Sequence, residues 1–228
     1  MIVGLVVARG GSKRFPDKAL AKINENSLIG ISILSGKKAQ KISKVVVSTD
    51  SEEIYAESLK YEPDWILDRA SGLSEDDSPI TDVIRHAVPF IEDFFNQKLT
   101  AVVLLQATSP LRTPRLIDLC IDRFQAENVE TLTTLRAIKE HPDWMWSIKD
   151  GKYAPVDSKK FFTSSKENQQ ELFIETGSVY VISRECALKG EIYGQSVSAI
   201  VEEPFSSVDI DFPIDLVVAK ELFKGIGY

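Results

Sequence analysis

Short apolar runs recur along the first half of the chain. Residues 2–8 (IVGLVVA), 44–49 (KVVVST) and 101–106 (AVVLLQ) are rich in β-branched residues and show no alternation with polar ones. A continuous apolar run of this length is typical of a strand buried on both faces of a sheet. The same pattern resumes at 173–182, and residues 199–203 indicate a short further strand.

Helix start signals follow these runs. Asp50 can cap a helix through Leu59, and Ser78-Pro79 opens another helix. Thr113 precedes a proline at a likely first helical position, and apolar residues from 116 to 124 follow with helical spacing. The chain therefore alternates strand and helix.

Repeated strand, helix, strand units predict parallel pairing and an α/β fold with helices covering the sheet. Ligands of such folds bind at the carboxyl ends of the strands. The turns after Ala8, Thr49 and Leu105 all lie at that edge. Between about 139 and 172 the pattern breaks into polar and aromatic stretches. We predict one domain over residues 1–228 with an insertion at about 139–172.

Composition narrows the class of partner. The chain has 228 residues, of which 43% are hydrophobic, and a formal net charge of −7. The size fits one domain, and the acidic balance argues against nucleic acid as a partner. The apolar start is too short to span a membrane. Cys120 and Cys186 form no disulfide framework or metal cluster, so we expect a cytoplasmic protein.

A basic, glycine-containing loop follows the first predicted strand. Gly10 and Gly11 permit positive φ and close backbone approach, and the cations at positions 9, 13, 14 and 18 can bind phosphate oxygens. An ordinary solvated loop has the same glycine and charge content. The spacing matches neither the P-loop nor the dinucleotide fingerprint.

Two carboxylates stand near the end of the chain. Residues 207–212 read as a strand, in which Asp209 and Asp211 share one face. Near a triphosphate they would hold Mg²⁺, which commonly takes one or two carboxylates with phosphate oxygens. Alternatively, Asp211 caps the helix that starts at Pro213 and Asp209 is merely exposed. The basic loop in the same fold favours the metal site.

Four motifs together identify a family resemblance. The ARGGSK loop with Pro16 and Lys18, the STD turn at 48–50, the LLQATSPLR segment at 104–112 and the DID segment at 209–211 resemble the acylneuraminate cytidylyltransferases. These are the CMP-sialic acid synthetases, and the resemblance covers nearly the whole chain. It implies a Rossmann-like, three-layer, mostly parallel sheet, Mg²⁺ dependence, and a homodimer built partly by the inserted, dimerising and sugar-binding region. The implied reaction joins CTP to a keto-sugar acid.

The resemblance also assigns residues. Lys18, Arg9 and Asp211 are implied as catalytic, and Asp209 with Asp211 as the metal ligands. Gln106, Thr176 and Gly177 are implied for the sugar. The residues implied for the nucleotide are Ala8, Arg9, Gly10, Gly11, Ser12, Lys13, Lys18, Arg69, Ser78 and Thr81.

Two departures from the family pattern bear on specificity. Ala19 stands where the family usually has an asparagine that helps recognise cytosine. Trp144 and Phe173–Gly177 stand where sialic acid enzymes tend to have basic residues for the sugar carboxylate. A legionaminic, pseudaminic or Kdo-like acid is thus an alternative to sialic acid. Two other hypotheses are a GTP- or UTP-dependent sugar-phosphate nucleotidyltransferase and a non-catalytic nucleotide-binding module.

Overall fold

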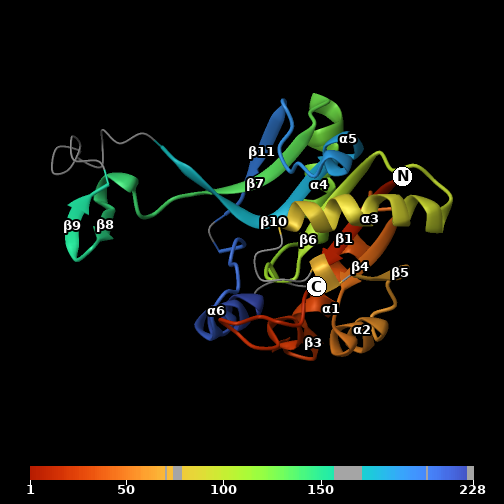
Figure 1. Cartoon of the computed structure of the whole chain (residues 1–228), viewed down its shortest axis with the longest axis horizontal. Coiled ribbons are helices and arrows are strands. Elements are labelled where there is room, and N and C mark those ends of the chain that lie inside the picture. The colour runs from red at the N-terminus through yellow and green to blue at the C-terminus, as the bar shows by residue number, and fades with distance from the viewer. Residues whose placement is uncertain (70, 74–78, 157–170, 204, 225–228) are drawn as a thin grey trace.

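The sheet of this protein has seven strands in the order β11-β7-β10-β6-β1-β4-β5 (Figure 1). The computed structural model describes the chain except residues 70, 74–78, 157–170, 204 and 225–228. The large sheet comprises β1 (Ile2–Val7), β4 (Lys44–Thr49), β5 (Trp65–Asp68), β6 (Ala101–Gln106), β7 (Thr131–Ala137), β10 (Phe173–Ser183) and β11 (Val197–Val201). Two small hairpins comprise β2 (Lys22–Ile23) with β3 (Asn26–Ser27), and β8 (Trp146–Lys149) with β9 (Lys152–Pro155).

The helices connect and cover these strands. They are α1 (Leu28–Lys38), α2 (Glu52–Leu59), α3 (Ile80–Phe95), α4 (Pro114–Glu127), α5 (Arg184–Lys189) and α6 (Pro213–Phe223), with 3-10 turns η1 (Lys18–Leu20), η2 (Ser71–Leu73) and η3 (Pro142–Trp144). None of the helices in the described part of the chain has both the length and the apolar character needed to cross a membrane.

The predicted α/β architecture is confirmed. β4 and β6 have the predicted bounds, and β1 ends one residue earlier than expected. β1 pairs in parallel with both β4 and β6, and β5 extends the sheet in parallel beyond β4. β10 is antiparallel to both of its neighbours, β6 and β7. The sheet is therefore mostly parallel, as predicted.

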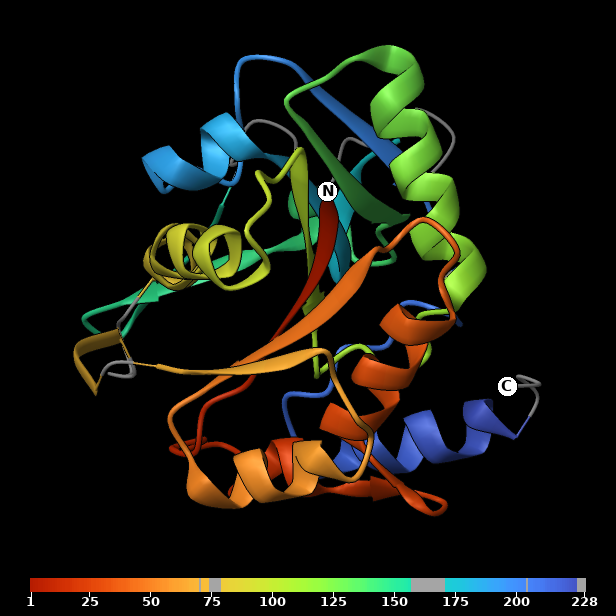
Figure 2. The same cartoon turned by 90° about the vertical axis from the view of Figure 1, so that its right-hand side faces the viewer.

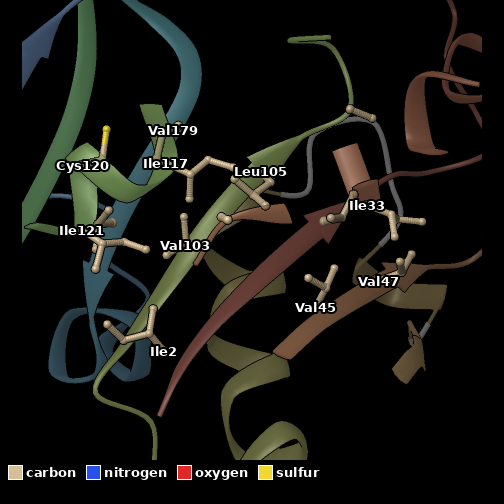
Figure 3. Close-up of a cluster of buried hydrophobic side chains, with 14 of the residues drawn as sticks. Ile2, Ile33, Val45, Val47, Val103, Leu105, Ile117, Cys120, Ile121 and Val179 are labelled. Atoms are coloured by element: carbon tan, nitrogen blue, oxygen red, sulfur yellow. The ribbon is translucent and has the colours of Figure 1, made fainter. Parts of the chain in front are cut away.

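Both faces of the sheet are buried, which explains the unbroken apolar runs. α1 and α4 cover one face and α3 and α5 the other (Figure 2). Val45, Val47, Val103 and Leu105 point to the α1 and α4 side, where they meet Ile33 (Figure 3). The alternate residues of the same strands enter the second core beneath α3.

Two helix starts differ from expectation. The side chain of Ser51, not Asp50, caps α2 by accepting a hydrogen bond from the backbone N–H of Ile54. α3 begins after Pro79, which occupies the N-cap position without a side-chain cap. The expected role of Ser78 lies outside the described residues. Thr113 caps α4 as predicted, with Pro114 in the first turn.

The inserted region projects from the sheet as an arm. It leaves β7 and returns through β10, and the β8–β9 hairpin lies far from the other strands (Figure 1). Most of the large apolar side chains of this hairpin and its flanks are exposed: Trp144, Met145, Trp146, Ile148, Tyr153 and Val156.

Candidate active site

The carboxyl ends of four neighbouring strands meet at one edge of the sheet. Val7 lies opposite both Ser48 and Gln106 in the strand register, and Thr49 lies opposite Asp68. The turns that follow β1, β4, β5 and β6 therefore emerge side by side. The convergence predicted from the order of strands is confirmed.

The basic loop after β1 is held against the turn after β4. The backbone N–H of Gly10 donates to Oδ1 of Asp50 at 3.3 Å. A Cβ added to Gly10 would lie 3.2 Å from Cβ of Ser51, so close approach explains this glycine. Gly10 and Gly11 do not adopt the positive φ that glycine permits, whereas Asp17 of the same loop has a φ of 53°.

The loop lines a cationic pocket of about 490 Å³. Its lining consists of Arg9, Ser12, Lys13, Arg14, Phe15, Lys18 and Asp211. Nζ of Lys18 lies 3.0 Å from Oδ1 of Asp211, and Nη1 of Arg14 lies 2.9 Å from Oδ2. The side chain of Lys18 is 17% exposed and that of Arg14 is 66% exposed, so Lys18 is the better shielded cation. Such a pocket can take up several phosphate oxygens.

The segment that carries the two aspartates is not a strand. Residues 207–212 form no ladder, and the prediction of a strand there is wrong. Ile210 is buried and its N–H donates to the carbonyl oxygen of Thr108 at 2.8 Å. This bond places the segment across the turn after β6. Asp211 therefore lines the cationic pocket, and Asp209 lines a larger pocket beside it.

The electrostatics of this pair suit a cation. Asp209 is exposed as a residue, but the protein around its carboxylate raises its pKa by desolvation, and the charge of Asp211 adds to this effect. The hydroxyl of Thr108 and the charge of Lys18 act in the opposite direction. The described residues contain no group of three or more His, Cys, Asp or Glu suited to a metal. A site of two carboxylates fits a metal that takes its remaining ligands from phosphate and water.

Asp211 does not cap α6, which was the alternative role considered for it. Asp215, in the first turn of the helix, accepts from the N–H groups of Asp211 and Phe212 at 3.0 and 2.7 Å. The carboxylate of Asp211 is thereby left to face Lys18 and Arg14.

A small cleft of about 180 Å³ connects the cationic pocket with the turn after β6. Its lining consists of Val7, Ala8, Arg9, Ser12, Lys18, Ala19, Gln106, Ala107 and Thr108. Ala19 is buried, so its methyl group forms part of the wall. The predicted nucleotide residues Ala8, Arg9, Ser12 and Lys18 are brought together here.

A larger pocket of about 760 Å³ lies on the far side of Gln106. Gln106, Thr176 and Gly177, the residues predicted for the sugar, all line it. A Cβ on Gly177 would lie 3.7 Å from Nε2 of Gln106, so these two residues lie side by side. The remaining lining consists of Arg136, Lys139, Glu140, Ile174, Glu175, Tyr180, Ser207, Val208, Asp209, Asp215 and Val218.

Arg136 and Lys139 are the functional candidates that sequence reasoning missed. Arg136 lies at the end of β7, which runs in the same direction as β6, because β10 is antiparallel to both. The available signal was that these basic residues lie at the end of a strand that runs in the same direction as β6. Both are cations in the lining of the pocket that holds the residues predicted for the sugar.

Two predicted residues contribute differently than expected. Arg69 is 5% exposed, and its Nη2 donates to the carbonyl oxygens of Ala8 and Ser48 at 2.9 and 2.7 Å. It thus ties the ends of β1 and β4 together beneath the site. Thr81 lies half-buried in the first turn of α3 and is not among the residues that line the pockets described above. Ser78 lies outside the described residues.

Comparison with known proteins agrees with the motifs and the fold. A family model described as cytidylyltransferase matches residues 3–225. The chain is 27% identical over 225 residues to post-translational flagellin modification protein B of Campylobacter coli, covering 98% of this chain and 95% of the relative. It is 26% identical, with the same coverage, to a CMP-N,N'-diacetyllegionaminic acid synthase of Campylobacter jejuni. The solved structure of a CMP:2-keto-3-deoxy-manno-octonic acid synthetase complexed with CTP has the same fold, with a TM-score of 0.71, 14% identity and 98% of each chain covered.

Proposed function

The chain belongs to the cytidylyltransferase family, and from this premise we propose that it joins CTP to an eight- or nine-carbon keto-sugar acid, giving a CMP-sugar and pyrophosphate. The family assignment disfavours both a non-catalytic module and an enzyme for GTP or UTP. Ala19, the residue that suggested another base, is compatible with CTP on this proposal because it only forms part of a cleft wall.

The observation that carries the proposal is the row of three pockets along one sheet edge. The cationic pocket and the small cleft share Arg9, Ser12 and Lys18, and the cleft and the larger pocket share Gln106. On this proposal the cationic pocket binds the triphosphate, the small cleft binds the nucleoside end of CTP, and the larger pocket binds the sugar acid. In this arrangement the α-phosphate lies between the basic loop and Gln106.

The larger pocket is suited to a sugar that carries one carboxylate. Arg136 and Lys139 offer it two cations, and the acids Glu140, Glu175, Asp209 and Asp215 also line the pocket. A sugar carboxylate is attracted to the two cations and repelled by the acids. Hydroxyl and amide N–H groups on the rest of the sugar can donate to those acids. We propose a legionaminic-type acid as the first substrate to test.

The transfer is an in-line displacement. The anomeric oxygen of the sugar forms a bond to the α-phosphorus of CTP and loses its proton to solvent, while the bond from that phosphorus to the bridging oxygen breaks. Pyrophosphate leaves with the electron pair. Lys18 and Arg9 stabilise the charge that develops on the phosphate oxygens, and Gln106 orients the sugar. Positioning and charge neutralisation supply the catalysis.

Asp209 and Asp211 would hold a Mg²⁺ ion beside the phosphates. Their oxygens would place its positive charge where phosphate charge has to be neutralised. The pair fits this role because its carboxylate oxygens accept and lie next to the cationic pocket. Desolvation and, less strongly, the charge of Asp211 raise the pKa of Asp209, and a bound cation would offset both effects.

The active form proposed is a homodimer built partly by the arm. Trp146, Ile148 and Tyr153 are 53%, 67% and 71% exposed on the β8–β9 hairpin. Exposed apolar side chains gathered on one projecting hairpin are typical of an association surface. A cytoplasmic location is also proposed, and the two free, buried cysteines fit a reducing compartment.

A substrate panel tests the proposal. The enzyme is incubated with each of the four nucleoside triphosphates, paired with keto-sugar acids or hexose 1-phosphates, and pyrophosphate release is followed. The proposal predicts release only with CTP and a keto-sugar acid, and only with Mg²⁺ present. Turnover confined to a sugar phosphate would refute it.

A further inference from the structure

A buried polar cluster lies behind the larger pocket, and of its members only Thr176 also lines that pocket. It joins Thr134 of β7, Thr176 of β10 and Glu202, which follows β11. These side chains are buried, and the residues are 0%, 4% and 6% exposed. Oγ1 of Thr176 lies 2.5 Å from Oε1 of Glu202 and 2.7 Å from Oγ1 of Thr134. The cluster therefore links three adjacent strands.

The carboxylate of Glu202 sets the direction of the shortest hydrogen bonds in the cluster. Each hydroxyl also lies near a backbone carbonyl, Thr134 at 3.4 Å from that of Val179 and Thr176 at 3.3 Å from that of Thr134. A carboxylate only accepts, so the hydroxyl of Thr176 gives its single proton to Glu202. The hydroxyl of Thr134 must then donate to Thr176, and its own oxygen accepts from the N–H of Val179 at 3.2 Å. The bonds run from Val179 to Glu202 as one polarised chain. Glu202 is its terminal acceptor.

This chain fixes an irregular turn of β10. The register of β10 against β7 shifts between Glu175 and Tyr180, and Gly177 within the shift has a φ of +72°. Oγ1 of Thr176 accepts from the N–H of Ser178 at 3.3 Å, so the side chain of the residue before Gly177 is bonded to the backbone of the residue after it. The turn places Gly177 beside Gln106 in the wall of the sugar pocket.

One polar atom of the cluster lowers the stability of the fold. Oε2 of Glu202 is buried and has no hydrogen-bond partner among the residues that the structure describes. A buried acceptor without a partner costs stability, and such a group calls for a functional explanation.

We propose that Glu202 is a positioning residue for the sugar acid, acting through Thr176 to hold the Gly177 turn against Gln106. The proposal rests on the function proposed above. Its effect should fall on the sugar pocket alone, because Lys18 and the basic loop lie at the other end of the row of pockets.

Variants of both partners test this role. Glu202→Met keeps the length of the side chain and removes the acceptor, while Glu202→Gln keeps an acceptor oxygen. Thr176→Val removes the hydroxyl and Thr176→Ser keeps it. Glu203→Met, at the exposed neighbouring residue, is the control.

We expect Glu202→Met and Thr176→Val each to raise KM for the sugar acid about tenfold, with KM for CTP unchanged. Glu202→Gln and Glu203→Met should stay near wild type, and Thr176→Ser should raise KM for the sugar acid less than Thr176→Val does. Because the two residues act as one chain, the double variant should be no worse than either single variant. The Tm of Glu202→Met should stay within about 3 °C of wild type.

A folded Glu202→Met variant with unchanged KM for the sugar acid would overturn the proposal, as would equal rises in both KM values. Hydrogen exchange across residues 173–180 provides a readout independent of turnover, and faster exchange is expected in Glu202→Met but not in Glu203→Met. Unchanged exchange would likewise refute the positioning role. If wild-type protein does not turn over any keto-sugar acid, the proposed function fails, and the exchange result still decides whether Glu202 holds the turn.

Discussion

The ammonium of Lys18 lies 3.0 Å from the carboxylate of Asp211, although 193 positions separate the two residues. The other carboxylate oxygen meets Arg14 at 2.9 Å. The basic loop at the start of the chain and the acidic segment near its end thus close over the same pocket. A triphosphate that enters this pocket competes with Asp211 for Lys18 and Arg14. A metal ion bound to Asp211 would compensate the carboxylate and so favour the transfer of these two side chains to the phosphates.

Removing the positive charge of Lys18 should impair the chemical step more than substrate binding. We expect Lys18→Met to lower kcat by about 10²- to 10³-fold, because a cation that stabilises developing phosphate charge is lost. Steady-state pyrophosphate release measures the effect. Lys38→Met, at an exposed lysine at the end of α1, is the control and should retain full activity. Equal activity of both variants would remove Lys18 from the catalytic machinery.

Removing the carboxylate of Asp211 should have opposite effects with and without metal. Asp211→Ala is expected to abolish Mg²⁺-dependent turnover, and to tighten CTP binding in the presence of EDTA because Lys18 and Arg14 are released. The fold should persist, since the side chain of Asp211 is 45% exposed and exposed ion pairs contribute little. Pyrophosphate release measures the turnover, calorimetric titration with CTP measures the binding, and Tm checks the folding. Unchanged turnover would exclude Asp211 as a metal ligand.

Arg136 should control the affinity for the sugar acid. Arg136→Gln is expected to raise KM for the sugar acid about tenfold or more and to leave KM for CTP unchanged, because a charge-assisted hydrogen bond to the sugar carboxylate is lost. Arg115→Gln, at an exposed position of α4, is the matched control. If both variants keep the wild-type KM, the sugar carboxylate binds elsewhere.

The arm should determine the oligomeric state. Ile148 and Tyr153 lie opposite each other on the hairpin and are exposed. Ile148→Lys is expected to shift the protein from dimer to monomer, because a charge buried in an apolar interface is unfavourable. Analytical ultracentrifugation measures the shift. Leu59→Lys, at a leucine of α2 that is 55% exposed against 67% for Ile148, should remain dimeric, and a monomeric wild type would contradict the proposed dimer.

The ion pair between Glu92 and Arg184 should govern stability in acid. Arg184 donates to both oxygens of Glu92 at 2.6 and 2.9 Å, and this contact, with the N–H of Leu99, lowers the pKa of Glu92 to about 2. Because the folded-state pKa lies below the unfolded value near 4.5, the stabilisation is present above pH 4.5 and is lost as pH falls towards 2.

Glu92→Gln should therefore destabilise the protein by about 2 kcal/mol at neutral pH. The difference from wild type should shrink as the pH falls below about 4.5. Urea unfolding at several pH values measures it. A difference that is independent of pH would show that the ion pair is not its cause.

The sequence predicted the central strands well because burial on both faces leaves a clear apolar pattern, as in β4 and β6. The prediction of a strand at residues 207–212 was wrong, because the alternation of apolar and acidic residues there has a different cause. Ile210 is buried with α6 and β2 in a separate cluster, and one backbone bond to Thr108 replaces a strand ladder. Alternation alone does not distinguish a paired strand from an extended segment that packs one side on a core.

The candidate site was predictable where function lies in a local motif, as with Lys18 in its loop. It was not predictable for Arg136, which reaches the site only because β7 runs parallel to β6. Nor does the sequence distinguish an arginine that binds a ligand from Arg69, which donates to the backbone carbonyls of Ala8, just after β1, and Ser48 of β4. Such roles depend on contacts between distant segments.

Product analysis tests the central claim most directly. Wild-type protein is incubated with CTP, Mg²⁺ and N,N'-diacetyllegionaminic acid, and the products are identified by mass spectrometry and ³¹P NMR. The account predicts a CMP-sugar with a single phosphodiester and an equal amount of pyrophosphate. Conversion of CTP to free CMP and pyrophosphate without a sugar adduct, with every keto-sugar acid supplied, would contradict it.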